Sequence, residues 1–136
     1  MLKDTQPTTV VRVARWVEEN IKVAIITKPA AYVASAVFEQ IIERLDEEGS
    51  WTSLLERLVL RFIGPDKESS QKQSIFLTAA LHQVGHLLAR EVVSKVNLMS
   101  ENLKMDVMRV LASEVDRLST DKFGSIVLKG LAESVI

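Results

Sequence analysis

The chain of 136 residues contains no cysteine, only five glycines and three prolines, and few aromatic residues. Without cysteine the protein has no disulfide bonds, no thiolate chemistry and no cysteine ligands for a metal. The scarcity of glycine and proline argues against a strand-rich fold, which needs turn residues about every 8–12 positions. The composition therefore favours helices joined by short turns.

A large excess of either charge is also absent, since the formal net charge is −1. No global field draws such a protein toward nucleic acid or an anionic membrane. The most apolar stretch, residues 21–42, is interrupted by charges and a proline, so it lacks the run of about 18 apolar residues of a spanning helix. The N-terminus has no secretory signal pattern. These absences predict a soluble, cytoplasmic protein that does not bind membranes.

The apolar residues that are present, 47% of the chain, recur at helical spacing throughout. We expect one all-α domain over residues 1–136, a multi-helix bundle of about six helices. The expected helices cover approximately residues 8–26, 29–48, 51–63, 74–96, 101–118 and 121 onward. Residues 66–74 are polar and predict a loop. Trp16 and Trp51 lie in apolar stripes and are expected in the core.

Both histidines of the chain, His82 and His86, lie four residues apart in the expected helix 74–96. At this spacing two imidazoles share a helix face and can chelate a metal, as in the H-E-x-x-H signature. Here Gln83 replaces the glutamate of that signature, so the general base is missing. We expect both histidines to pack and hydrogen-bond at a helix–helix or subunit boundary, with no metal. Gly85 between them predicts a close helix crossing.

Glu114 is the third candidate, because it falls inside the apolar stripe of the expected helix 101–118. A buried carboxylate needs a partner, since burying it without compensation costs several kcal/mol. His82 or His86 is a possible partner, directly or through a metal ion. The alternative is that Glu114 reaches solvent at the edge of its stripe. The three residues are the candidates for a metal site, a haem site or a pH-sensitive ion pair.

Catalytic motifs are absent from the sequence, including nucleophile elbows, phosphate-binding glycine loops and E-x-x-H pairs. Acidic residues do occur next to one another, at 18–19 and 46–48. Adjacent residues on a helix diverge by about 100°, so neither group forms an acid–base site. We therefore expect no enzyme activity and no cofactor.

A faint repeat relates residues 84–93 to residues 123–132, 39 residues further on, and residues 33–42 follow a similar pattern. Residues 118–133, LSTDKFGSIVLKGLAE, resemble the turn and second helix of a Pumilio-type RNA-binding repeat. The resemblance implies that side chains of this helix read one base per repeat. The implied reading positions are Ser35, Ala36, Glu39, His86, Leu87, Arg90, Ser125, Ile126 and Lys129.

The chain departs from that family in several respects. The base-stacking position holds Ala36, Leu87 and Ile126, none of which is planar. Segments 33–42 and 84–93 are 51 rather than 39 residues apart, and the net charge does not suit phosphate binding.

Protein–protein interaction or assembly is therefore the expected function, without catalysis. An apolar helix face would bind a protein partner or a second copy of the chain, because helices 8–26 and 29–48 carry apolar residues outside their main stripes. The first alternative is RNA binding by a helical repeat, for which His86, Arg90, Ser125 and Lys129 are the candidate contacts. The second alternative is a helical domain that binds metal or haem through His82 and His86.

Overall fold

The computed structural model describes residues 6–47, 49–65 and 74–134. Within these ranges the chain forms nine α-helices, one short 3-10 helix and no strand, which confirms the all-α prediction. The expected loop at 66–74 lies outside the described residues except for Ser74. The Ser74 hydroxyl accepts the backbone N–H of Leu77 at 3.0 Å and so caps the helix that follows.

The α-helices follow a pattern of long helix, six-residue helix, long helix that occurs three times. We call each set of three helices a unit. The first unit contains α1 (Pro7–Glu19), α2 (Ile21–Ile26) and α3 (Lys28–Glu43). The second contains α4 (Gly49–Ile63), α5 (Ile75–Ala80) and α6 (His86–Ser94), and the 3-10 helix η2 (Val96–Leu98) follows it. The third contains α7 (Glu101–Ser113), α8 (Val115–Thr120) and α9 (Lys122–Ser134).

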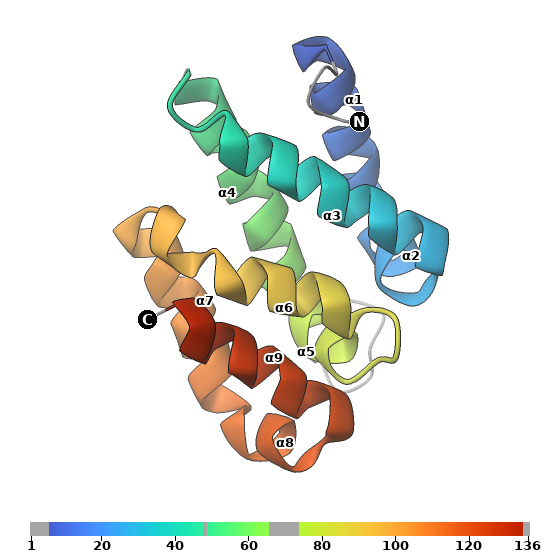
Figure 1. The fold of residues 1–136 in the computed structure, drawn as a ribbon, viewed down its shortest axis with the longest axis vertical. Coiled ribbons are helices and arrows are strands. Elements are labelled where there is room, and N and C mark those ends of the chain that lie inside the picture. Colours follow the sequence, from blue (N-terminus) through green and yellow to red (C-terminus); the bar gives the residue numbers. More distant parts are fainter. Residues whose placement is uncertain (1–5, 48, 66–73, 135–136) are drawn as a thin grey trace.

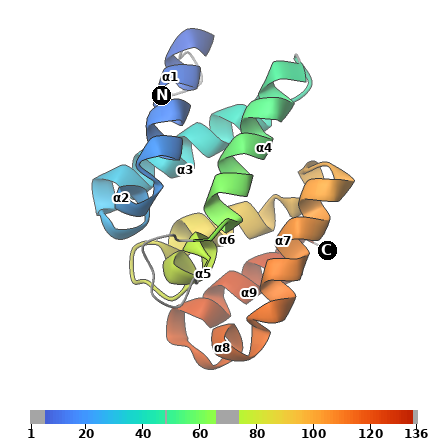
Figure 2. The same ribbon diagram turned by 180° about the vertical axis from the view of Figure 1, so that it is seen from behind.

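The units stack so that their helices form two layers. Figure 1 shows α3, α6 and α9 side by side in the front layer, although they are far apart in the sequence. Figure 2, from behind, shows α1, α4 and α7 in the other layer. Extensive contacts join α6 to α9, and α3 lies against both α4 and α6. Residues of every unit contribute to one continuous apolar core between the layers.

The structure differs from the predicted six helices because three of them are broken. Segment 8–26 divides at Asn20, whose side-chain amide donates to the Trp16 carbonyl at 2.9 Å. Segment 101–118 divides at Glu114, and segment 74–96 divides between α5 and α6. These breaks turn the chain between layers. Apolar periodicity continues across each break, because the residues on both sides face the same core.

The two tryptophans differ in their surroundings. Trp51 is buried, as expected, and the Arg44 guanidinium lies 5.3 Å from its ring centroid. Trp16 is 43% exposed, so the prediction that it belongs to the core is wrong. It lies near the end of α1, next to the break at Asn20.

Gly85 precedes α6 at a close backbone approach between the first two units. A Cβ atom there would lie 2.6 Å from the Ile25 carbonyl oxygen of α2 and 2.8 Å from Cα of Ala79. The predicted close approach is present, although Gly85 lies at the start of α6 and not inside a longer helix. Gly124 is equivalent in the third unit, where a Cβ would lie 2.7 Å from Cα of Leu118.

We predict that Gly85→Ala lowers the free energy of unfolding by more than about 1 kcal/mol, and that Gly85→Leu lowers it further. The neighbouring atoms are backbone atoms, which cannot move aside as a flexible side chain would. Urea denaturation measures the effect. Gly49→Ala is the matched control, because a Cβ at Gly49 meets no atom within 4 Å. If Gly85→Ala left the free energy of unfolding unchanged, the turn would have room to shift around the added methyl group.

Candidate functional site

His82 and His86 do not share a helix face, because the turn between α5 and α6 separates them. The His82 Nδ1 atom accepts the backbone N–H groups of Val84 at 3.0 Å and Gly85 at 3.4 Å. His82 therefore caps the turn into α6 with its ring, and this removes the i, i+4 geometry predicted for a metal-binding pair.

His86 is the first residue of α6 and connects the second unit to the third. Its side chain is buried, and its ring stacks on Phe123 of α9 with centroids 4.8 Å apart. Its Nδ1 atom lies 3.1 Å from the carbonyl oxygen of His82, and a carbonyl only accepts, so Nδ1 carries the proton. His86 thus occupies a helix–helix boundary, as the sequence predicted.

Asp121 has the same position relative to Gly124 as His82 has relative to Gly85. One carboxylate oxygen of Asp121 accepts the N–H groups of Phe123 at 2.8 Å and Gly124 at 2.9 Å. The pattern of capping residue followed three positions later by glycine is therefore shared by the two turns. This shared turn is the structural basis of the repeat between residues 84–93 and 123–132.

Glu114 does not lie on an apolar helix face, contrary to the expectation for segment 101–118. It separates α7 from α8, and its side chain is 30% exposed. Its carboxylate lies 4.0 Å from the Arg117 guanidinium, which is a long contact near the surface. Glu114 thus reaches the edge of its stripe, and the proposed pairing with His82 or His86 is wrong. Among the described residues, no three histidine, aspartate or glutamate side chains are grouped so that they could hold a metal ion.

The candidate RNA contacts lie on α6 and α9, and most make contacts within the protein. His86 is buried against Phe123, and the Arg90 guanidinium pairs with Glu133 of α9 at 2.6 Å. The Ser125 hydroxyl donates to the carbonyl oxygen of Lys122 at 3.1 Å. Lys129 is exposed. Three of the four candidate contacts are therefore engaged within the protein.

Two carboxylates meet across the boundary between α3 and α6. Burial raises the pKa of Glu91 above its ordinary value, and the neighbouring charge of Glu39 raises it further. A hydrogen bond with the Glu39 side chain acts in the same direction, while Lys95 and Arg90 lower the pKa. This pair is unfavourable for an approaching phosphate, which is also an anion.

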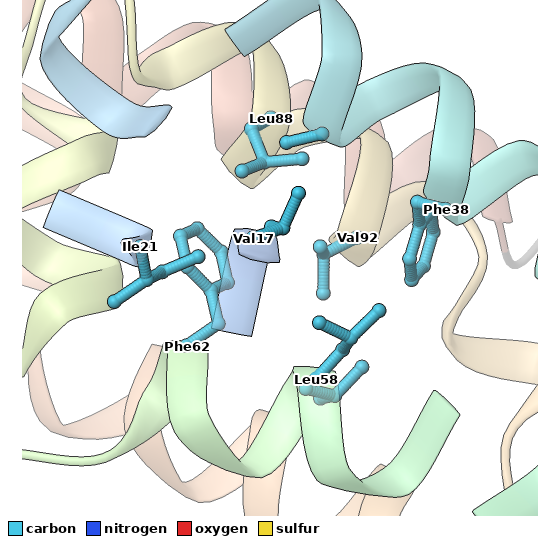
Figure 3. A pocket seen from close by; sticks show the side chains of 9 residues that line it. Val17, Ile21, Phe38, Leu58, Phe62, Leu88 and Val92 are labelled. Carbon is cyan, nitrogen blue, oxygen red and sulfur yellow. The ribbon is translucent and has the colours of Figure 1, made fainter. Parts of the chain in front are cut away.

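A small apolar cavity of about 20 Å³ lies where α1, α3, α4 and α6 meet. Figure 3 shows Val17, Leu88 and Val92 pointing into it, with Phe62 and Leu58 from α4 closing another side. Its size is close to that of one water molecule, and its lining side chains are all apolar. It is a packing defect of the core rather than a ligand site.

Exposed apolar side chains gather on consecutive helices of the first unit. We define the α2–α3 patch as Val23 and Ile26 of α2 with Tyr32 and Val33 of α3. Tyr32 is 61% and Ile26 54% exposed, and α2 and α3 are in extensive contact. The apolar residues that the sequence places outside the main stripes are mostly in the core. Val23 is exposed and Val11 half-buried, whereas the others are buried: Ala14, Ile25, Ala30, Ala34 and Phe38.

No known family model matches the chain, and no curated protein or solved structure matches it either. The resemblance of residues 118–133 to a Pumilio repeat therefore depends on those residues alone. In the described part of the chain, no helix has both the length and the apolar character that crossing a membrane requires.

The sequence interpretation did not find the contact between Glu39 and Glu91, nor the capping role of His82. In the sequence Glu39 is one of the implied reading positions, and Glu91 is an ordinary helix residue. Only the stacking of α3 on α6 brings the carboxylates together. The cap had a sequence signal, since His82 and Asp121 both precede a glycine by three residues.

We predict that His82→Ala lowers the free energy of unfolding by about 1 kcal/mol, because two backbone N–H groups lose their acceptor. His82→Asn should retain most of the stability, since its short side chain carries an oxygen that can accept them. Thermal denaturation measures both variants, and Asp121→Ala with Asp121→Asn forms a matched pair in the third unit. Equal losses for His82→Ala and His82→Asn would assign the effect to packing of the ring.

We predict that Glu91→Gln stabilises the protein at neutral pH by roughly a few tenths of a kcal/mol, because the pair is partly open to solvent. A raised pKa in the folded state means that the native protein binds more protons than the unfolded chain above pH 4.5, the ordinary value. Wild-type stability should therefore fall as the pH rises from 4.5 through the raised pKa.

The decrease in stability should be smaller in Glu91→Gln, measured by denaturation across this pH range. Glu19→Gln, at the exposed end of α1, changes the same charge and should leave the pH dependence unchanged. A Glu91→Gln variant less stable than wild type at neutral pH would contradict repulsion between the carboxylates.

Proposed function

We propose that the protein is a non-enzymatic helical-repeat module that binds another protein through the α2–α3 patch. The observation that supports this most directly is the exposure of Val23, Ile26, Tyr32 and Val33 on two adjoining helices. Single exposed apolar residues are ordinary, whereas neighbouring ones on a folded surface indicate an interface. Tyrosine is enriched in interfaces because its ring is apolar and its hydroxyl can still hydrogen-bond.

The arrangement of the units supports the repeat assignment. Each unit has the same order of helix lengths, and the last two share the cap and glycine of their turns. Stacked helical units form extended surfaces, and such proteins commonly bind other macromolecules through them. Chemistry is not part of the proposal, because the sequence carries no catalytic motif.

RNA binding is the second candidate, because the structure places α3, α6 and α9 next to one another, as base-reading helices of a repeat array would be. The acidic residues on these helices argue against RNA binding. Glu39, Glu91 and Glu133 lie on these helices, and Arg90 is paired with Glu133. RNA binding would predict an affinity for oligonucleotides that falls steeply as salt is added.

We predict that a photo-crosslinking residue at position 26 captures one protein partner in cells of the source organism. The purified partner should bind wild type and lose at least tenfold in affinity for Ile26→Glu, because the substitution buries a charge in the interface. Ala112→Glu and a crosslinker at position 112, on exposed surface of α7, are the matched controls.

If the captured partner is a second copy of this chain, sedimentation velocity should show a dimer that Ile26→Glu converts to a monomer. Equal capture from positions 26 and 112, or an unchanged affinity for Ile26→Glu, would contradict the proposed interface. Binding of RNA with no protein partner would favour the second candidate.

A further inference from the structure

A groove of about 610 Å³ lies between α1 and the beginning of α4, on the layer opposite to α6 and α9. Both helices begin at the same end of the molecule (Figure 2). Val11, Trp51 and Leu54 give the groove an apolar floor, and Arg12, Arg15 and Arg57 are among its lining residues. This surface lies where the first unit meets the second and does not include residues of the α2–α3 patch.

Positive charge dominates the groove, although the whole chain has a net charge of −1. Arg57 pairs with Glu18 at 3.1 Å, and the Arg57 side chain stays largely exposed to solvent. Arg12 and Arg15 are exposed and form no ion pair with any residue that the structure describes. Glu47 is the acidic residue of the lining. The first turns of α1 and α4 add partial positive charge at this end.

The apolar residues that line the groove indicate which kind of anionic partner fits it. Trp51 and Leu54 are buried, with 5% and 8% of their surface exposed, and Arg44 covers the Trp51 ring. No aromatic face of Trp51 is therefore open to stack on a nucleic-acid base, which is the usual means of holding a single strand. An apolar floor beside arginines instead suits a peptide that carries both apolar side chains and carboxylates.

We propose that this groove binds an acidic amphipathic segment of a partner protein. Apolar side chains at helical spacing would contact Val11 and Leu54, and flanking aspartate or glutamate side chains would pair with Arg12 and Arg15. This is recognition of a helix in a groove, in which apolar anchors supply affinity and charges set orientation and specificity. The inference rests on the proposed function as a protein-binding module, and it adds the chemical class of a partner segment and a second binding surface.

The test is selection of a random 16-residue phage-displayed peptide library on the purified protein. We expect enriched peptides to carry acidic residues beside apolar residues at helical spacing. Synthesised and labelled, they should bind wild type with an affinity that decreases at high salt. The double variant Arg12→Glu/Arg15→Glu should bind them at least tenfold more weakly. Its melting temperature should match that of wild type, because both side chains are exposed.

The double variant Lys122→Glu/Lys129→Glu is the matched control. It makes the same change in net charge on exposed residues of α9, at the other end of the stack (Figure 1), and should keep wild-type affinity. No enrichment, enriched peptides without acidic residues, or equal losses in the two double variants would overturn the proposal. Tighter binding of a single-stranded RNA oligonucleotide that Arg12→Glu/Arg15→Glu abolishes would also overturn it, in favour of a nucleic-acid groove.

Failure of this proposal is distinguishable from failure of the proposed function. Crosslinking at position 26 reports on the α2–α3 patch and does not involve Arg12 or Arg15. If peptide binding at the groove fails while crosslinking at position 26 succeeds, the groove proposal is overturned and the proposed function is retained.

Discussion

The turn between α5 and α6 is the contact on which the stacking of the three units depends. At Gly85 the backbone of the second unit approaches the Ile25 carbonyl of the first within the space that a side chain would occupy. His82 holds this turn with its ring nitrogen. One residue further, His86 stacks on Phe123 of the third unit. A few consecutive residues therefore connect all three units, and larger side chains at Gly85 would separate them.

The same stacking decides how charge is distributed on the layer of α3, α6 and α9. Arg90 of α6 and Glu133 of α9 form an exposed ion pair because these helices are neighbours. The pair contributes little to stability, but the charge of Glu133 neutralises that of Arg90. The stacking also brings Glu39 to Glu91, where burial and the neighbouring negative charge raise the pKa of Glu91. Most of the side chains that look like free contacts on α6 and α9 in the sequence are thus engaged within the protein. For this reason neither proposed binding surface lies on α6 or α9.

Both proposed surfaces lie at the edge of the core, one on the first unit and one between the first and second units. The surface on α2 and α3 is apolar, and the one beside α1 and α4 combines an apolar floor with arginines. The surfaces differ in chemistry, so they would bind different parts of one partner or two partners. Under this proposal, the protein would hold other proteins together.

Sequence periodicity alone determined the all-α class and most of the buried positions, because each helix must place an apolar face on the core. It also located the close approach at Gly85, since an interior glycine is costly unless a neighbour needs the space. It did not find the breaks at Asn20 and Glu114 or the break between α5 and α6. Apolar spacing continues through a turn whenever both sides face the same core.

The surroundings of the candidate site residues depended on tertiary structure more than the fold class did. A helix through residues 74–96 would have placed His82 and His86 on one face, and the turn separated them into a cap and a boundary residue. The meeting of Glu39 with Glu91 joins residues 52 positions apart in the sequence. Local sequence specifies which residues can form a helix or a cap. Which side chains meet across helices is decided only when the units stack, because those contacts depend on the distance and angle between helices.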